Sequence, residues 1–146
     1  MLILGCQEDI PNPKSIHELV NNWHHAAAVA DEDVFFGSMT KDCIYIGTDI
    51  SERWLRDELK SWSAKIFERE SAWRFKAYDR FVEFDESGKI AWWDEKLETW
   101  MGPCRGSGVA KNINGEWKII HYHLSVTVPN DNIQEFIKLV EEPKEL

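Results

Sequence analysis

Hydrophobic and polar residues alternate most regularly in the second half of the chain, between Lys89 and Val128. Two turn dipeptides, Gly102-Pro103 and Asn114-Gly115, interrupt this segment, and Asn-Gly between β-rich runs is a strong hairpin signal. The pattern therefore predicts three consecutive antiparallel strands, over residues 89–101, 104–111 and 117–128.

The last of these strands is hydrophobic on both of its faces. Strict alternation gives one face Trp117, Ile119, His121, His123 and Ser125, and gives the other Ile120, Tyr122, Leu124 and Val126. A free antiparallel sheet usually has one polar side. We therefore expect a strongly curved sheet with helices in its concavity, the first set facing inward. The second set is expected to drive homodimer formation through the outer sheet face.

The first half of the chain has mainly helical spacing. A helix is predicted from Ser15, because Ser15 and Glu18 form a capping-box pattern. A short helix is predicted over Val34–Met39, because Asp31-Glu-Asp33 places acidic charge at its N-terminus. A strand over 43–47, a helix capped by Ser51, a long bulged strand over 71–84 and a terminal helix over 133–140 complete the prediction. This order is typical of an α+β domain. We expect a flexible segment over residues 1–14 and a single domain over residues 15–146.

Composition narrows the possible partners. The chain has 146 residues, 43% hydrophobic and 29% charged, which is typical of one globular domain. Its net charge of -9 argues against a nucleic-acid partner or an anionic membrane surface, because both need a basic patch. No membrane-spanning hydrophobic run is present. The 8 Trp are unusual, and Trp often lines ligand cavities and interfaces.

The three cysteines have neither metal-site nor disulfide spacing. Cys43 and Cys104 lie in apolar, strand-like surroundings and are expected to be buried thiols. Cys6 follows Leu-Ile-Leu-Gly, which resembles the end of a bacterial lipoprotein signal peptide but is too short to direct secretion. As written the chain is expected to be cytoplasmic; the alternative is a lipoprotein anchored at Cys6, if the true start lies upstream.

Several motifs together carry a family resemblance. They are Phe36-Gly-Ser-Met, Tyr45-Ile-Gly-Thr-Asp49, Glu52-Arg-Trp54, Ala91-Trp-Trp-Asp-Glu95, Arg105-Gly-Ser-Gly108 and the run from Trp117 to Ser125. From Ile16 to Val128 the chain resembles the SnoaL-like group of the nuclear transport factor 2 superfamily, which includes ketosteroid isomerase. The resemblance implies a cone-shaped, curved antiparallel sheet that encloses N-terminal helices, is open at one end and often dimerises through its outer face. The superfamily includes enzymes, association domains and proteins without known activity, so the fold alone does not choose a function.

The ketosteroid isomerase site is not retained. The resemblance places Trp23 at the position of its tyrosine donor, Gly47 at the position of its aspartate base, and an apolar position near Val109 at that of its second acid. Asp49 lies two residues beyond the base position. Steroid isomerisation is therefore not expected.

Other polar residues are candidates for a site inside the cone. We expect Arg105 to pair there with Asp94 or Glu95, and His121 and His123 to face the same space. His123 and Glu95 are the candidate general acid and base. The expected aromatic wall consists of Tyr45, Trp54, Trp62 and Trp92.

A His-x-His pair on a strand can also supply two metal ligands, with Glu95 or His24 as a third, but no family pattern supports this alternative. We expect no metal and no cofactor. Two classes of function remain open: a binder or enzyme acting on a small molecule in the cone, and a non-catalytic association module.

Overall fold

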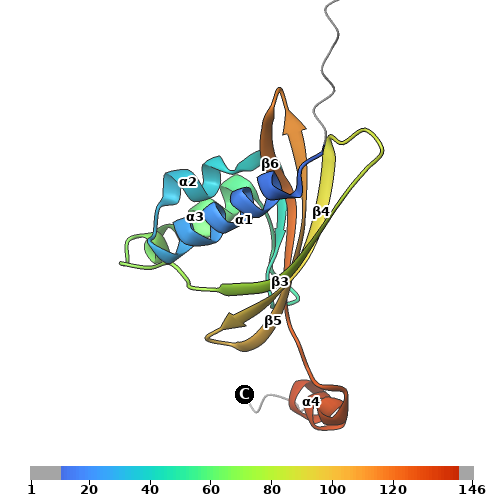
Figure 1. Ribbon diagram of the computed structural model, residues 1–146. Helices are drawn as coiled ribbons and strands as arrows, with labels where there is room; N and C mark the ends of the chain where they lie inside the picture. Colours follow the sequence, from blue (N-terminus) through green and yellow to red (C-terminus); the bar gives the residue numbers. More distant parts are fainter. Residues whose placement is uncertain (1–10, 142–146) are drawn as a thin grey trace, which may run out of the picture.

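A six-stranded curved sheet with helices on one side forms the domain (Figure 1). The computed structural model describes residues 11–141, so Cys6, the attachment point in the alternative lipoprotein interpretation, lies outside the described residues. The elements in chain order are α1 (Pro13–Ala28), α2 (Glu32–Gly37), β1 (Met39–Ile46), β2 (Arg53–Leu55), α3 (Arg56–Phe67), β3 (Lys76–Phe84), β4 (Ile90–Thr99), β5 (Gly102–Ile113), β6 (Glu116–Val126), the 3-10 turn η1 (Asn130–Asn132) and α4 (Ile133–Glu141).

The strands lie in the order β2-β1-β6-β5-β4-β3. All neighbours are antiparallel except β1 and β6, which are parallel. Helices α1, α2 and α3 lie together on one side of the sheet (Figure 1). The predicted α+β class and curved sheet are confirmed.

Local capping chemistry sets where the first two helices begin. The predicted cap, Ser15, lies inside α1, because Pro13 occupies the first helical turn and Asn12 accepts a hydrogen bond from the Lys14 N–H at 3.0 Å. At α2 the side chain of Asp31 accepts a hydrogen bond from the Val34 N–H, also at 3.0 Å. The acidic residues before α2 therefore do cap it, as their position suggests.

The start of α3 was wrongly predicted. Ser51 lies in the loop after β1, and its N–H donates to Asp49 Oδ1 at 2.9 Å. Residues 53–55 then pair with β1 as the short strand β2, so the helix begins only at Arg56. Glu58 Oε2 accepts from the Leu55 N–H at 2.8 Å at this junction. A three-residue strand is too short to have a recognisable alternation in the sequence.

A bulge in β6 reverses the predicted faces of that strand. Ala110 lies opposite Ile119, but Val109 lies opposite His121, so Ile120 is an extra residue in the ladder. One extra residue moves every later side chain to the other face. Tyr122 and Leu124 therefore join Ile119 in the core. The expectation that Tyr122 and Leu124 form an outer dimer surface is wrong for this reason.

A second bulge, in β3, turns one cation toward the core. Tyr78 pairs with Lys96 and Phe81 with Asp94, so Asp79 and Arg80 together oppose a single residue, Glu95. Asp79 has a positive φ of 47°, which is uncommon outside glycine. Its carboxylate stays outside and accepts from Lys96 Nζ at 2.9 Å. Arg80 is thereby directed inward.

The core between α1 and the sheet is largely aromatic. The Trp23 ring stacks on Phe35 with centroids 4.9 Å apart and meets the edge of Tyr122 at 4.6 Å. Gly106 and Gly108 of β5 make room for this packing: a Cβ at Gly106 would collide with the Tyr122 hydroxyl, and one at Gly108 with the Trp93 ring. Core aromatic side chains therefore fill the space beside these two glycines.

No helix of the described residues is long and apolar enough to cross a membrane. The α4 helix differs from the other three because none of its residues is buried, and Figure 1 draws it well apart from α1–α3.

Cys43 and Cys104 are buried free thiols, as expected. Burial, together with nearby Asp42, raises the pKa of Cys43 to about 12, so this thiol is unreactive near neutral pH.

The contact between Gly108 and Trp93 gives a test of this packing. Gly108→Ala should lower the free energy of unfolding by about 1–3 kcal/mol, because the added methyl group overpacks the core. Gly37→Ala is the matched control, since a Cβ there meets nothing within 4 Å. Urea denaturation checks both variants. Equal stability of the two would contradict the described position of Trp93.

Candidate functional site

A buried carboxylate links the first helix to the sheet. Glu95 on β4 has 0% exposure, and its side chain points toward α1. His24 Nε2 on α1 lies 2.6 Å from Glu95 Oε1, and the Tyr122 hydroxyl donates to the same oxygen at 3.1 Å. The Arg80 Nε donates to the other oxygen, Oε2, at 2.7 Å. Both carboxylate oxygens are therefore satisfied by charged or polar partners.

Arg80 extends this cluster to the backbone of α1. Its Nη1 donates to the carbonyl oxygen of His17 at 3.2 Å and to Asn21 Oδ1 at 2.8 Å. The bulge in β3 is what brings the guanidinium to this side of the sheet. One cation thus joins β3, β4 and α1.

The partners of Glu95 keep it ionised. Burial raises the pKa of Glu95, but the His24 hydrogen bond and the charges of His24 and Arg80 outweigh burial, so the pKa lies below its usual value. Burial and the same carboxylate raise the pKa of Tyr122 well above its usual value. Tyr122 therefore remains a neutral phenol that donates a hydrogen bond.

The described contacts assign this cluster to stability rather than to chemistry. A general acid or base must reach a substrate atom, and Glu95 has no exposed surface. Asp94 and Glu95 are neighbours on a strand and so point to opposite faces, and Glu95 is the one that faces inward. It lies beneath the core aromatic side chains and lines neither hollow described below.

The other polar candidates lie on the outer face of the sheet. Asp94 accepts from Arg105 Nη1 at 2.8 Å, and both side chains are about half exposed. His123 lies opposite Ser107, and His121 opposite Val109, in the same outward-facing rows. Expecting these four side chains in the cone was an error, caused in β6 by the extra residue at Ile120.

The outward histidines line neither of the two hollows described below. The Ser125 hydroxyl lies 3.3 Å from His123 Nε2. Burial, followed by the charges of His123 and Arg53, lowers the pKa of His121. Trp92 lies in the row of Val109 and is 43% exposed, so it belongs to this face and not to the aromatic wall of the cone.

An aromatic cavity of about 140 Å³ opens at one end of the cone. Residues of β1, β2 and α3 contribute to its lining. It has eleven lining residues, of which six are aromatic. They are Tyr45, Gly47, Thr48, Glu52, Trp54, Leu59, Trp62, Trp73, Phe75, Trp100 and Leu124. Tyr45, Trp54 and Trp62, which the sequence indicated as a wall, lie here together. Trp62 and Trp100 are 54% and 82% exposed.

Glu52 supplies the charge of this cavity. A Cβ at Gly47 would collide with Glu52 Oε2, so the carboxylate occupies the space that a side chain at Gly47 would take. The loop holds it there, because Glu52 Oε2 accepts from the Asp49 N–H at 3.1 Å and the Gly47 N–H donates to the Glu52 carbonyl at 2.9 Å. Burial and the Glu52 charge both raise the pKa of Tyr45, which keeps its phenol protonated.

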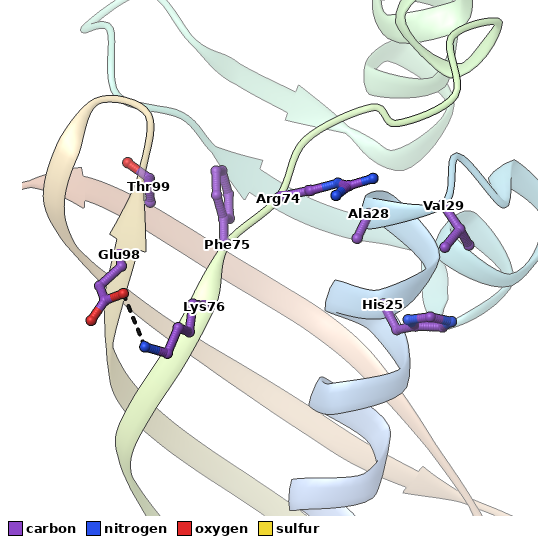
Figure 2. A pocket seen from close by; sticks show the side chains of 8 residues that line it. All are labelled: His25, Ala28, Val29, Arg74, Phe75, Lys76, Glu98 and Thr99. Atoms are coloured by element: carbon purple, nitrogen blue, oxygen red, sulfur yellow. Dashed lines mark hydrogen bonds and ion pairs between the residues drawn. The ribbon is translucent and has the colours of Figure 1, made fainter.

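A larger, open hollow of about 540 Å³ adjoins the end of α1 (Figure 2). His25 and Ala28 of α1 and the C-cap residue Val29 line it on one side. The other lining residues are Arg74, Phe75, Lys76, Glu98 and Thr99. An ion pair at 3.1 Å between Lys76 Nζ and Glu98 Oε2 lies in this hollow. Phe75 lines both hollows.

Within residues 11–141, no group of three or more His, Cys, Asp or Glu side chains is arranged to hold a metal ion. The alternative metal site is also excluded by topology. His121 and His123 lie on the outer face, whereas Glu95 and His24 lie inside the core.

Sequence reasoning missed Glu52, Trp73 and Trp100. Trp73 and Trp100 were assigned to the strands predicted over 71–84 and 89–101, but β3 and β4 cover only Lys76–Phe84 and Ile90–Thr99, so both residues lie in loops. Glu52 could have been suspected, because a glycine at the usual base position leaves space for a nearby carboxylate. Arg80 was missed because its inward direction depends on the bulge at Asp79.

Comparison with known proteins identifies a family. The family model of the SnoaL-like domain matches residues 16–129. A search of curated proteins finds no significant match.

Solved structures agree on the fold. A domain of unknown function with a cystatin-like fold from Nostoc punctiforme has a TM-score of 0.72 at 14% identity, over 91% of this chain and 88% of that one. A proposed ketosteroid isomerase from Parabacteroides distasonis has a TM-score of 0.64 at 19% identity, over 88% and 96%. A proposed calcium/calmodulin-dependent protein kinase II association domain from Xanthomonas campestris has a TM-score of 0.61 at 17% identity, over 80% and 88%. Such different descriptions at this identity support the fold alone.

The Glu95 cluster predicts a specific dependence of stability on pH. Its folded-state pKa is lower than the usual 4.5, so its contribution is present above pH 4.5 and is lost as pH falls through the folded pKa. Glu95→Gln should lower the free energy of unfolding at pH 7 by about 3–5 kcal/mol, since it leaves Arg80 and His24 without their counterion.

Asp94→Asn is the matched control, because it removes a neighbouring carboxylate from an exposed pair worth less than about 1 kcal/mol. Chemical denaturation between pH 3 and pH 7 measures both variants. A Glu95→Gln protein that is as stable as Asp94→Asn at pH 7 would contradict the stabilising role of the cluster.

Proposed function

The chain belongs to the SnoaL-like family, and we propose that it binds a small organic molecule in the aromatic cavity. The observation that carries this proposal is the composition of the lining: six aromatic side chains surround a cavity with one carboxylate and one phenol. Ligand sites are typically concave and apolar, with a few polar groups that orient the ligand. Four of the 8 Trp of the chain gather here.

Exposure of the rim supports the same reading. Trp62 and Trp100 remain exposed at the mouth, although tryptophan is usually well buried. A ligand that covered these rings would remove apolar surface from water. The size of the cavity favours a small ligand, because about 140 Å³ is less than the roughly 300–1,000 Å³ of typical ligand pockets.

Chemical conversion in this cavity would use Glu52 and Tyr45. Glu52 is the available base, and the raised pKa of Tyr45 keeps its phenol as a proton or hydrogen-bond donor. These two residues replace His123 and Glu95 as candidates for acid–base chemistry, because the latter lie on the outer face and in the closed core. Binding does not require this step.

A fluorescence experiment tests the binding site. Small organic ligands, screened with phenol, benzoate and choline as representative probes, should change Trp emission saturably. Trp62→Ala should weaken the response about three- to tenfold, as expected for loss of one aromatic contact.

Trp92→Ala is the control, since Trp92 has similar exposure but lies on the outer face. It should leave the affinity unchanged. A response lost equally in both variants, or no response from a broad panel of small molecules, would contradict a ligand site in this cavity.

A second candidate function, association, is favoured by two exposed apolar surfaces. On the outer sheet face, Leu55, Phe81 and Trp92 are 43%, 65% and 43% exposed. On α4, the exposed apolar residues are Ile133, Phe136, Leu139 and Val140. Contiguous exposed apolar residues favour an interface. We propose a homodimer through the outer sheet face, carried by Phe81 and Trp92 instead of the buried Tyr122 and Leu124.

Sedimentation at micromolar concentration tests the dimer. The wild-type protein should be a dimer, and Phe81→Glu should dissociate it by burying a charge in the interface. Leu139→Glu, on α4, should leave it dimeric. A monomeric wild type would refute the dimer, and dissociation by Leu139→Glu alone would move the interface to α4.

A further inference from the structure

We propose that the ligand of the aromatic cavity is a small organic cation with an alkylated ammonium head, such as a trimethylammonium group, held by aromatic ring faces and the Glu52 carboxylate. This inference rests on the proposed function and specifies its ligand class.

The rings of the cavity suit a cation. Trp54 and Trp62 lie with ring centroids 4.8 Å apart and planes tilted by 32°, and the ring of Tyr45 lies 6.3 Å from that of Trp54. Aromatic faces carry partial negative charge and attract a cation within about 6 Å of the ring centroid, most strongly for Trp. A group of neighbouring rings can therefore contact several methyl groups of one ammonium head.

The rings are held by the core below them. Trp73 contacts Phe35 and Phe67 with centroids 5.4 and 5.5 Å away, the latter on α3. Tyr45 contacts the buried Tyr122 at 5.7 Å. Because these contacts hold the inner rings of the aromatic cavity in place before a ligand binds, binding costs less free energy for ordering these side chains.

The charge of the lining has one sign. Glu52 is the only ionisable side chain among the lining residues that is charged near neutral pH, and none of the eleven is Lys, Arg or His. The Asp49 N–H donates to one of its oxygens, whereas a carboxylate has about four acceptor positions. In the proposed complex, the acceptor positions that this bond leaves unused contact the ammonium head.

Desolvation favours a cation over a neutral ligand of the same shape. An apolar ligand at the mouth would remove water from Glu52 and return no charge, which is unfavourable. An ammonium head offsets that loss through its attraction to the carboxylate in a less polar environment. An anionic ligand would be repelled by Glu52.

Size and net charge agree with this choice. A cavity of about 140 Å³ equals the liquid volume of roughly five water molecules, which suits a compact head group. The net charge of -9 also raises the local concentration of cations around the protein. A phosphate attached to the head group would lower the affinity, since the lining offers no basic side chain to hold it.

Calorimetric titration of the wild-type protein with three probes tests the proposal. Choline should bind. Its neutral carbon isostere, 3,3-dimethylbutan-1-ol, should bind with an affinity at least about tenfold lower, because it lacks the cation–π and carboxylate attraction. Phosphocholine, the head group of a common lipid, should also bind more weakly than free choline.

Two variants locate the charge effect. Glu52→Gln should weaken choline binding about tenfold, because the carboxylate attraction is lost. The neutral alcohol should bind as well or more tightly, because its binding no longer removes water from a charge. Glu98→Gln is the control, because it removes one negative charge from the neighbouring hollow and none from the aromatic cavity. It should change choline affinity less than about twofold at moderate salt, where distant charges are screened.

The outcomes separate the two proposals. Equal or tighter binding of the neutral alcohol would overturn the cation proposal while supporting a small-molecule site. Tighter binding of phosphocholine would overturn recognition of the free cation. Absence of binding by all three probes would overturn the cation proposal, and the broader fluorescence screen then decides the proposed function separately.

Discussion

The buried carboxylate of Glu95 is the interaction on which much of this structure depends. Removing an ion from water costs several kcal/mol even in a relaxed protein interior, so its partners must be held in place. His24 comes from α1, Arg80 from β3 and Tyr122 from β6. Satisfying one charge therefore fixes the helix against three strands of the sheet.

Several local features follow from this requirement. The bulge at Asp79 turns Arg80 inward and keeps the Asp79 carboxylate outside, where it pairs with Lys96. Gly106 leaves room for the Tyr122 hydroxyl beside Glu95. A regular β3 would instead place Asp79 opposite Glu95, and two carboxylates would repel each other.

The sequence predicted the elements better than the direction of individual side chains. Hydrophobic alternation and turn dipeptides located β4, β5 and β6, and the acidic start of α2 was correctly interpreted. The inward face of β6 was wrongly predicted beyond Ile119, because strict alternation assumes a strand without a bulge. The extra residue Ile120 directs His121 and His123 outward and Tyr122 inward. Glu52 and Trp100 lie in or next to loops, whose direction depends on the complete fold.

The cavity and the charge cluster have separate roles in this account. Glu95 lies in closed, fully paired surroundings, whereas Glu52 lines a cavity beside the exposed rings of Trp62 and Trp100. The similarity to a proposed ketosteroid isomerase supports the fold alone, and the space beside Gly47 is occupied by the Glu52 carboxylate.

A crystal structure of the protein grown with choline is the most direct test of this account. We predict density for the ammonium head in the cavity lined by Trp54, Trp62 and Glu52, against the ring surfaces that these two packed tryptophans leave open, with the Glu95 cluster unchanged. A cavity closed by its own tryptophan side chains, or choline bound only elsewhere on the surface, would contradict it.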